Sequence, residues 1–290
     1  MQELAARPFA ELGAFAESPR WHDGRLWFSE LRDGRVSTVD ADGRAETVCE
    51  VPTPLGLGWL PDGRLLAVSL AEYGIFSFDG ERVAPYCDLS SHCAGPPNDI
   101  VVDGRGRVYV GNMGARNFLE GEPPKPADLV LVDADGTPAA AAPGLMFANG
   151  MVLSADGRTL IVAETFAGRL TAFDVDPADG SLAGRRVFAA LGGRTPDGLA
   201  LDAEGAVWVG SMETGEFLRV LEGGEITHRV VPGGRSTPAC ALGGPDGRTL
   251  FMVTVEKPAE IDNITEALHG GITRARIEVA EAPVPGVGLA

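Results

Sequence analysis

The sequence predicts an all-β protein folded as a six-bladed β-propeller, and three observations lead to this class. A hairpin phrase, in which an apolar run, an acidic turn with glycine and a second run follow one another, returns six times along the 290 residues. The returns are about 40–50 residues apart, the repeat length of a propeller blade with four strands. The 39 Gly and 21 Pro suit many short strands joined by tight turns, and no helical periodicity separates the copies.

The hairpin phrase is clearest at residues 195–210, where the turn Ala203-Glu-Gly205 joins two apolar runs. The other copies lie at residues 17–28, 55–68, 98–110, 149–162 and 239–253. A β-sandwich or two stacked β domains would also explain the strands, but not the regular return of the Asp-Gly-Arg turn. We therefore expect a single propeller domain over residues 1–290.

The blades follow one another in chain order. They are expected at residues 17–52, 53–92, 96–144, 147–191, 195–233 and 237–280. Residues 34–40, 74–79 and 169–175 have the composition of third strands. Residues 9–15 are expected to join the last blade and close the ring, because closure removes a sheet edge that would otherwise invite aggregation.

Two segments interrupt this pattern. The insertion from Met113 to Asp128 contains Pro123-Pro-Lys-Pro126, which is incompatible with a regular element, and long loops of this kind are often functional lids. Residues 259–268 fit either a short helix or a loop, and the tail from Pro283 to Ala290 is expected to be mobile.

Charge and hydropathy exclude several classes of partner. The net charge is −17, from 41 acidic and 24 basic residues, so the surface repels nucleic acid and anionic membranes. The N-terminal residues contain no apolar signal-peptide core, and no apolar run approaches the length of a membrane span. We expect a cytoplasmic protein that acts on a small molecule, without nucleic-acid or membrane partners.

The cysteines favour free thiols. The chain has four, Cys49, Cys87, Cys93 and Cys240, and none forms a CxxC pair. A reducing cytoplasm keeps thiols unpaired, although a bridge between Cys87 and Cys93 is an alternative.

A polar cluster emerges when the copies are aligned on their turn glycines. Counting back eight residues from each glycine, or seven in the shorter first copy, reaches Glu17, Leu55, Asn98, Asn149, Asp197 and Ala239. Equivalent positions of a repeat fold lie around one mouth of the central channel, so the four polar side chains should meet there. Two carboxylates and two amides are ligands for a hard cation. Ca²⁺ is the first choice; Mg²⁺, Mn²⁺ or Zn²⁺ would also fit, although the cluster lacks the His and Cys that zinc prefers.

Four short motifs resemble those of the senescence marker protein (regucalcin)/gluconolactonase/luciferin-regenerating enzyme family. They are Glu17-Ser-Pro-Arg-Trp21, Pro97-Asn-Asp99, Phe147-Ala-Asn-Gly-Met151 and Pro196-Asp-Gly-Leu199. The resemblance covers nearly the whole chain and implies a six-bladed propeller with one divalent cation, in a family where many members hydrolyse lactones. It implies that Glu17, Asn149 and Asp197 are metal ligands and that Asn98 contacts the metal or the substrate. It also implies that Asp197 is the general base.

One departure from the family pattern concerns the substrate. Sugar-lactone members often carry a basic residue two positions before the asparagine of blade three, and Pro96 stands there in this chain. Arg116, in the insertion, is a candidate replacement, and Asn112 is a further candidate contact at the end of a strand. We therefore expect sugar lactones to be poorer substrates than smaller or more apolar lactones.

Three functional interpretations follow. The first is a metal-dependent hydrolase that opens a lactone or related cyclic ester, with the cation polarising the carbonyl group. The second keeps the fold and metal but changes the reaction, to a strictosidine-synthase-like condensation or another hydrolysis. The third is a non-enzymatic calcium-binding propeller.

Overall fold

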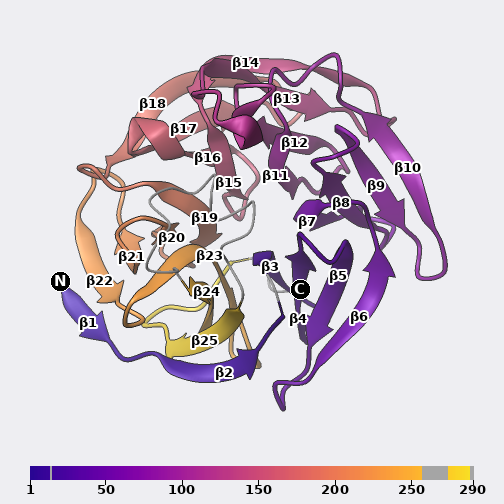
Figure 1. The fold of residues 1–290 in the computed structure, drawn as a ribbon. Helices are drawn as coiled ribbons and strands as arrows, with labels where there is room; N and C mark the ends of the chain where they lie inside the picture. The colour runs from indigo at the N-terminus through magenta and orange to yellow at the C-terminus, as the bar shows by residue number, and fades with distance from the viewer. Residues whose placement is uncertain (14, 257–273, 288–290) are drawn as a thin grey trace.

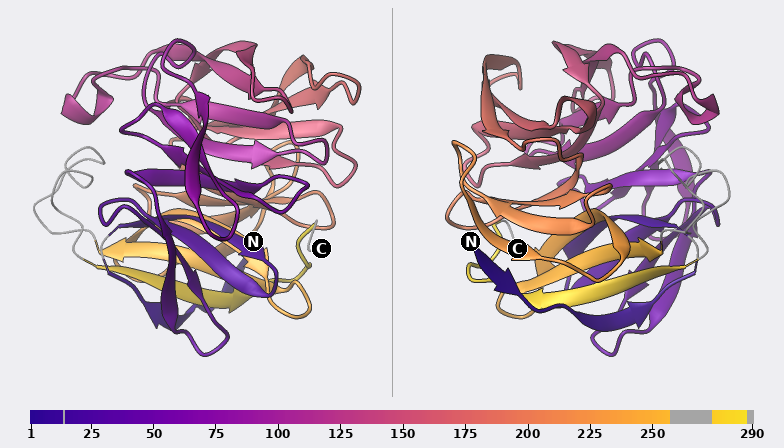
Figure 2. Two further views of the ribbon diagram at one scale, coloured as in Figure 1. Left: turned by 90° about the vertical axis from the view of Figure 1, so that its right-hand side faces the viewer. Right: turned by 60° about the vertical axis from the view of Figure 1, so that its left-hand side comes forward.

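The computed structural model describes residues 1–13, 15–256 and 274–287, and over these ranges the chain forms six sheets around a central channel (Figure 1). Five sheets have four strands and one has five. Within each blade the strands follow as an antiparallel meander, with the first strand innermost. The views in Figure 2 show the blades stacked around the ring. The expected six-bladed propeller is confirmed.

Blades one to three contain four strands each. Blade one has β3 (Ala16–His22), β4 (Arg25–Glu30), β5 (Arg35–Val39) and β6 (Ala45–Glu50). Blade two has β7 (Pro54–Trp59), β8 (Leu65–Ser69), β9 (Gly74–Phe78) and β10 (Val83–Asp88). Blade three has β11 (Pro97–Val102), β12 (Val108–Asn112), β13 (Pro126–Val132) and β14 (Pro138–Met146).

The second half of the ring continues the series. Blade four has β15 (Ala148–Leu153), β16 (Thr159–Glu164), β17 (Arg169–Val175) and β18 (Leu182–Ala190). Blade five has β19 (Pro196–Leu201), β20 (Val207–Ser211), β21 (Glu216–Val220) and β22 (Ile226–Val230). Blade six has β23 (Arg235–Gly243), β24 (Thr249–Glu256) and β25 (Ala275–Glu281).

The N-terminal segment closes the ring. Strand β2 (Arg7–Glu11) pairs antiparallel with β25 and becomes the outer strand of blade six. Strand β1 (Gln2–Leu4) runs parallel to β22 and adds a fifth strand to blade five. Figure 1 shows the two strands bridging neighbouring blades. The expected closure is confirmed, with the strand beginning slightly earlier than residue 9.

Two expectations about irregular segments need correction. The insertion ends in a regular strand, because β13 begins at Pro126 and pairs with β14; a proline is tolerated at the first position of a strand. The insertion also contains the short 3₁₀ helix η1 (Phe118–Glu120); a second, η2 (Thr165–Ala167), follows β16. The tail is held by hydrogen bonds as far as Val287, whose N–H donates to Leu201 O at 3.1 Å, and residues 288–290 lie outside the described part of the chain. Residues 259–268 lie outside the described part of the chain.

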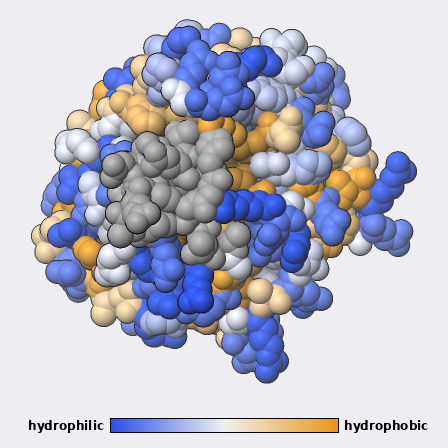
Figure 3. All heavy atoms as spheres, viewed as in Figure 1, coloured by the Kyte–Doolittle hydropathy of each residue, from blue (hydrophilic) through white to orange (hydrophobic). Residues whose placement is uncertain are grey.

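Apolar side chains fill the space between neighbouring blades. Trp208, Tyr109 and Phe28 are among the largest side chains that are fully buried, as expected for residues that pack one sheet against the next. All four cysteines are buried free thiols, so the alternative bridge between Cys87 and Cys93 is wrong. Figure 3 shows hydrophilic residues around much of the rim of one face and hydrophobic residues beside its centre. Across the described ranges, no helix has the length and hydropathy to cross a bilayer.

Candidate metal and active site

The candidate site is built on a β-bulge that every blade repeats. The pairing of the innermost strand with its neighbour shifts register at one place in each blade. The shifts lie between Glu17/Arg20, Pro54/Leu57, Pro97/Ile100, Ala148/Met151, Pro196/Leu199 and Ser236/Ala239. A bulge adds one residue to one strand and turns its side chain away from the regular alternation. Six bulges at one height therefore create a ring of redirected side chains.

These bulges correct the alignment made from the turn glycines. Ser18 lies six positions before Gly24, whereas Thr237 lies ten positions before Gly247. The first hairpin is thus shorter than the other hairpins and the last one longer. Thr237, not Ala239, occupies the bulge position in blade six, since Ala239 pairs regularly with Val253. Glu17 lies one residue before the bulge position, which Ser18 occupies.

Glycine lets the inner strands approach closely at the level of the bulges. A Cβ atom on Gly150 would lie 2.5 Å from Asp197 O, and one on Gly198 would lie 2.4 Å from the Cβ of Ala239. On Gly56 it would lie 2.6 Å from Ile100 N. These separations are too short for any other residue, so glycine at these positions sets the distance between the strands that carry Asn149 and Asp197.

The four polar residues that the sequence singled out line one cavity. Glu17, Asn98, Asn149 and Asp197 come from four inner strands, and each is less than one-tenth exposed. The rest of the wall is apolar and consists of Phe15, Leu31, Leu55, Leu70, Met113, Phe118 and Phe147. Met113 and Phe118 belong to the insertion, which therefore forms part of this mouth.

Neighbouring groups orient the polar side chains. The N–H of Ser18 donates to Glu17 Oε2 at 2.9 Å. Asn149 donates from Nδ2 to Thr165 Oγ1 at 3.2 Å, and the Thr165 hydroxyl donates to Pro196 O at 2.8 Å. With its nitrogen engaged by Thr165, Asn149 keeps Oδ1 as the atom suited to coordinate a cation.

Sequence reasoning missed an ion pair beside this cluster. Arg20 donates from Nη2 to Asp99 Oδ1 at 2.6 Å, and the N–H of Ile100 donates to the same oxygen at 2.8 Å. The signal was present, because Arg20 and Asp99 are charged residues inside two of the quoted motifs, on strands that line the channel. With Glu17 and Asp197 ionised, the three carboxylates and one guanidinium sum to −3 + 1 = −2. A divalent cation would balance that charge.

Burial raises the pKa values of both carboxylates in the cavity. Desolvation, with a smaller contribution from the charge of Asp99, raises the pKa of Glu17 to about 8, while the Ser18 hydrogen bond and Arg20 oppose the shift. The pKa of Asp197 also lies well above its ordinary value, because of burial first and the charges of Glu17 and Asp99 second. Both carboxylates lack a sufficient positive partner, which is the environment a metal cation relieves.

The donor set fits a hard cation. Among the described residues, no three His, Cys, Asp or Glu side chains converge as metal ligands. The candidate site instead combines two carboxylates with two amides, and amide oxygens are common Ca²⁺ ligands. The cavity wall contains no His or Cys, the side chains that zinc prefers, so it suits zinc less well than Ca²⁺.

The other two sequence candidates lie elsewhere. Both ends of the Asn112 amide bind backbone, with Nδ2 donating to Asp128 O at 2.8 Å and Oδ1 accepting from Gly114 N at 3.1 Å. Arg116 sits 4.9 Å from the ring centre of Tyr73 and donates to Ser90 O. Neither side chain lines the cavity of the polar cluster. Asn112 fixes the insertion, and Arg116 contacts blade two.

Known proteins are similar to this chain in sequence and in fold. Residues 15–256 match the family model described as the SMP-30/Gluconolactonase/LRE-like region. A 6-deoxy-6-sulfogluconolactonase of Pseudomonas putida is 26% identical over 93% of both chains. A pentonolactonase of Haloferax volcanii is 28% identical over 82% of this chain and 80% of its own. The calcium-binding protein regucalcin of Agrobacterium tumefaciens has the same fold, with a TM-score of 0.77 at 22% identity over 99% of this chain and 98% of that chain.

A six-bladed propeller with an oxygen-rich cluster at one mouth of its channel is typical of proteins that act on small molecules. Within that class, the chain belongs to the SMP-30/gluconolactonase/LRE-like family, because the family model spans most of its length.

Proposed function

We propose that this protein is a lactonase-like hydrolase that opens a lactone or related cyclic ester with the help of one divalent cation. The observation that supports this most is the buried cluster of Glu17, Asn98, Asn149 and Asp197, whose negative charge a cation would balance. Relatives named as a sulfogluconolactonase and a pentonolactonase support the reaction class. The relative described as a calcium-binding regucalcin supports Ca²⁺ as the ion, with Mg²⁺, Mn²⁺ or Zn²⁺ as alternatives.

Each polar residue has a role in this proposal. Glu17, Asn149 and Asp197 hold the cation, and Asn98 contacts either the cation or the substrate. When bound, the cation polarises the lactone carbonyl and stabilises the charge that develops on its oxygen. Asp197 accepts a proton from the attacking water as general base. A positive ion beside it would favour its ionised form, which is the form a base requires.

The apolar wall of the cavity supports a substrate with few hydroxyl groups. Seven hydrophobic side chains surround the polar cluster, and hydroxyl groups against such a wall would lose hydrogen bonds to water. Pro96 stands where relatives of the sugar-lactone type often carry a basic residue, and its carbonyl accepts from Met113 N at 3.0 Å. Arg116 contacts Tyr73 and Ser90 instead of the cavity. The proposed substrate class is therefore a small or apolar lactone.

Calorimetry on chelator-treated protein tests the cation site. Ca²⁺ should bind at one site per chain, and Asp197→Ala should abolish that binding together with lactone hydrolysis. Asp176→Ala is a matched control, because the exposed side chain of this aspartate accepts a turn hydrogen bond from Ala178 N in blade four. If chelator leaves both the melting temperature and the activity unchanged, the cation proposal is wrong. Cation binding without turnover of any lactone would favour a different reaction or a calcium-binding protein.

A lactone panel tests the substrate class. The missing basic residue removes one charge-assisted hydrogen bond, worth about 1.5–3 kcal/mol, so kcat/KM for a sugar lactone should be about tenfold to a hundredfold below that for an apolar lactone. Pro96→Arg should narrow this difference, and Arg116→Ala should leave it unchanged. A wild-type preference for sugar lactones would show that other groups bind the substrate hydroxyls.

A further inference from the structure

A second cavity lies at the other end of the channel. The inner strands carry the polar cluster near their first residues and line this cavity two to four residues later, a separation of about 7–13 Å along a strand. Its volume is about 320 Å³, and small-molecule pockets occupy about 300–1,000 Å³. It shares no lining residue with the cavity of the polar cluster.

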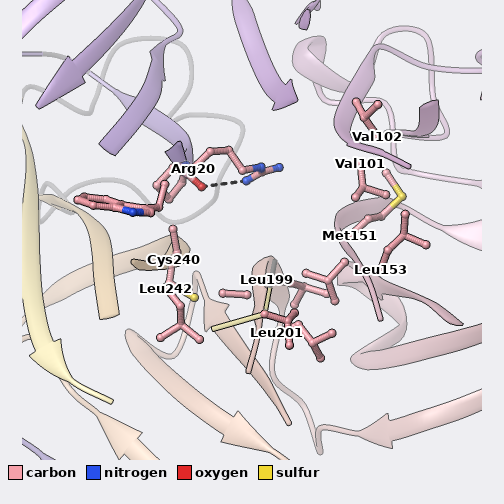
Figure 4. A pocket seen from close by; sticks show the side chains of 15 residues that line it. Arg20, Val101, Val102, Met151, Leu153, Leu199, Leu201, Cys240 and Leu242 are labelled. Carbon is pink, nitrogen blue, oxygen red and sulfur yellow. Dashed lines mark hydrogen bonds between the residues drawn. The ribbon is translucent and has the colours of Figure 1, made fainter. Parts of the chain in front are cut away.

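The wall of this second cavity is largely apolar and comes from five of the six inner strands and from Val287 of the C-terminal tail. The strands β3, β11, β15, β19 and β23 contribute, and Figure 4 shows their side chains facing a common space. The apolar members include Val101, Val102, Met151, Leu153, Leu199 and Leu242. Blade two contributes none, because Gly58 packs against Val102, whose Cγ2 would lie 2.6 Å from a Cβ added there.

Among the described residues that line this wall, Arg20 is the only charged one. Figure 4 shows its guanidinium extending from β3 into the space between the apolar side chains. Nη2 donates to Asp99 and to Ile100 O, and Nη1 donates to Pro19 O. Among the described residues, Nε has no hydrogen-bond partner, and the side chain remains 21% exposed. Asp99 and the backbone thus fix the guanidinium while leaving one edge able to donate.

We propose that this second cavity binds a small carboxylate with an apolar body, such as a medium-chain fatty acid. The hydrophobic wall would cover the body, and Arg20 would donate charge-assisted hydrogen bonds to the carboxylate. A neutral apolar molecule would leave the free edge of Arg20 without an acceptor. A cationic ligand would lie next to the guanidinium of Arg20, which carries a charge of the same sign. We call the end of the channel that carries Glu17, Asn98, Asn149 and Asp197 the polar mouth. Binding in the second cavity requires neither the cation nor the reaction proposed for the polar mouth.

Calorimetric titration of the chelator-treated full-length chain with octanoate and with octanol tests this site. Chelator is needed because a carboxylate could otherwise bind a cation at the polar mouth. Val152 lines the cavity and is half-buried, so it can carry a polar replacement. Val152→Glu places a negative charge in the wall, and Val152→Gln is its uncharged match in size. Asp197→Asn tests whether octanoate binds at the polar mouth instead of in the second cavity.

Octanoate should bind at least tenfold more tightly than octanol. Val152→Glu should weaken octanoate binding at least tenfold, while Val152→Gln and Asp197→Asn keep it within about threefold of the wild type. Absence of octanoate binding at millimolar concentrations would overturn the proposal. Equal affinity for octanoate and octanol would also overturn it. So would an equal loss of octanoate affinity in Val152→Glu and Val152→Gln at an unchanged melting temperature, or a loss of octanoate binding in Asp197→Asn. None of these results depends on lactone hydrolysis, so failure here leaves the proposed function intact.

Discussion

At the scale of single residues, the polar mouth holds two buried carboxylates, those of Glu17 and Asp197, that form no ion pair among the described residues. Glu17 and Asp197 are buried together, while the one arginine nearby, Arg20, is already paired with Asp99. Asp202, a few residues along the same blade, is equally buried but accepts from Arg219 Nε at 2.6 Å. Two buried aspartates in blade five thus have opposite electrostatic surroundings, and substitution should affect them in opposite ways.

Asp197→Asn should raise the melting temperature of the cation-free protein, because it removes a buried charge that repels Glu17 and Asp99. Asp202→Asn is the matched control and should lower the free energy of unfolding by about 3–5 kcal/mol, since it leaves Arg219 without its buried partner. Thermal and urea unfolding in chelator measure both effects. A lower stability in Asp197→Asn would contradict the interpretation of this mouth as electrostatically strained.

The same carboxylates predict how stability depends on pH. The folded-state pKa of Glu17 is raised from 4.5 to about 8, and that of Asp197 is raised as well. A raised carboxyl pKa means that the contribution to stability is fully present below the unfolded-state pKa and is lost as the pH rises through the folded-state pKa. The melting temperature of the chelator-treated protein should therefore fall between pH 5 and pH 8. Saturating Ca²⁺ should remove most of this fall, and a flat profile without cation would argue against the shifts.

At the scale of the elements, the site depends on inner strands that bulge at one height and touch through glycine. The bulge redirects Asn98, Asn149 and Asp197, and glycine allows the backbones to approach. The outer strands only support this arrangement. The distance between neighbouring inner strands should therefore control cation affinity more directly than any contact on the blade surface.

Gly150→Ala should weaken Ca²⁺ binding at least tenfold and destabilise the protein by about 1–3 kcal/mol, because its Cβ would push the strand carrying Asp197 outward. Gly104→Ala is the control, since a Cβ at that turn glycine meets nothing within 4 Å. Calorimetry and thermal unfolding compare the two. If both variants bind Ca²⁺ with the wild-type affinity, the close approach is not what sets the geometry of the site.

At the scale of the whole molecule, the ring is held closed by the first residues of the chain. Strand β2 covers the edge of β25, and β1 adds to the neighbouring blade. We propose that residues 1–290 form one domain, in which this closure couples all six blades into a single cooperative unit. An open ring would expose the backbone edge of β25.

Removal of residues 1–11 should lower the melting temperature and promote self-association, because the uncovered edge of β25 can pair with another chain. Removal of residues 1–5 is the control and should cost less, because it deletes only the three-residue β1. Thermal unfolding and light scattering measure stability and assembly. A single transition near the wild-type temperature after removal of residues 1–11 would show that closure is not needed.

The sequence by itself determined the repeat, the number of blades, the closing strand and the four polar residues of the mouth. These features were accessible because turn chemistry and alternating patterns are local, and because repeats place equivalent residues around one axis. Tertiary structure alone decided which positions are equivalent, since the bulges move the blade-six position from Ala239 to Thr237. Three further features are visible only in the tertiary structure: the hydrogen bond of Asn112 to the backbone of the insertion, the ion pair of Arg20 with Asp99, and the second cavity. Those features depend on strand register and on contacts between residues far apart in the chain, which spacing along the sequence does not encode.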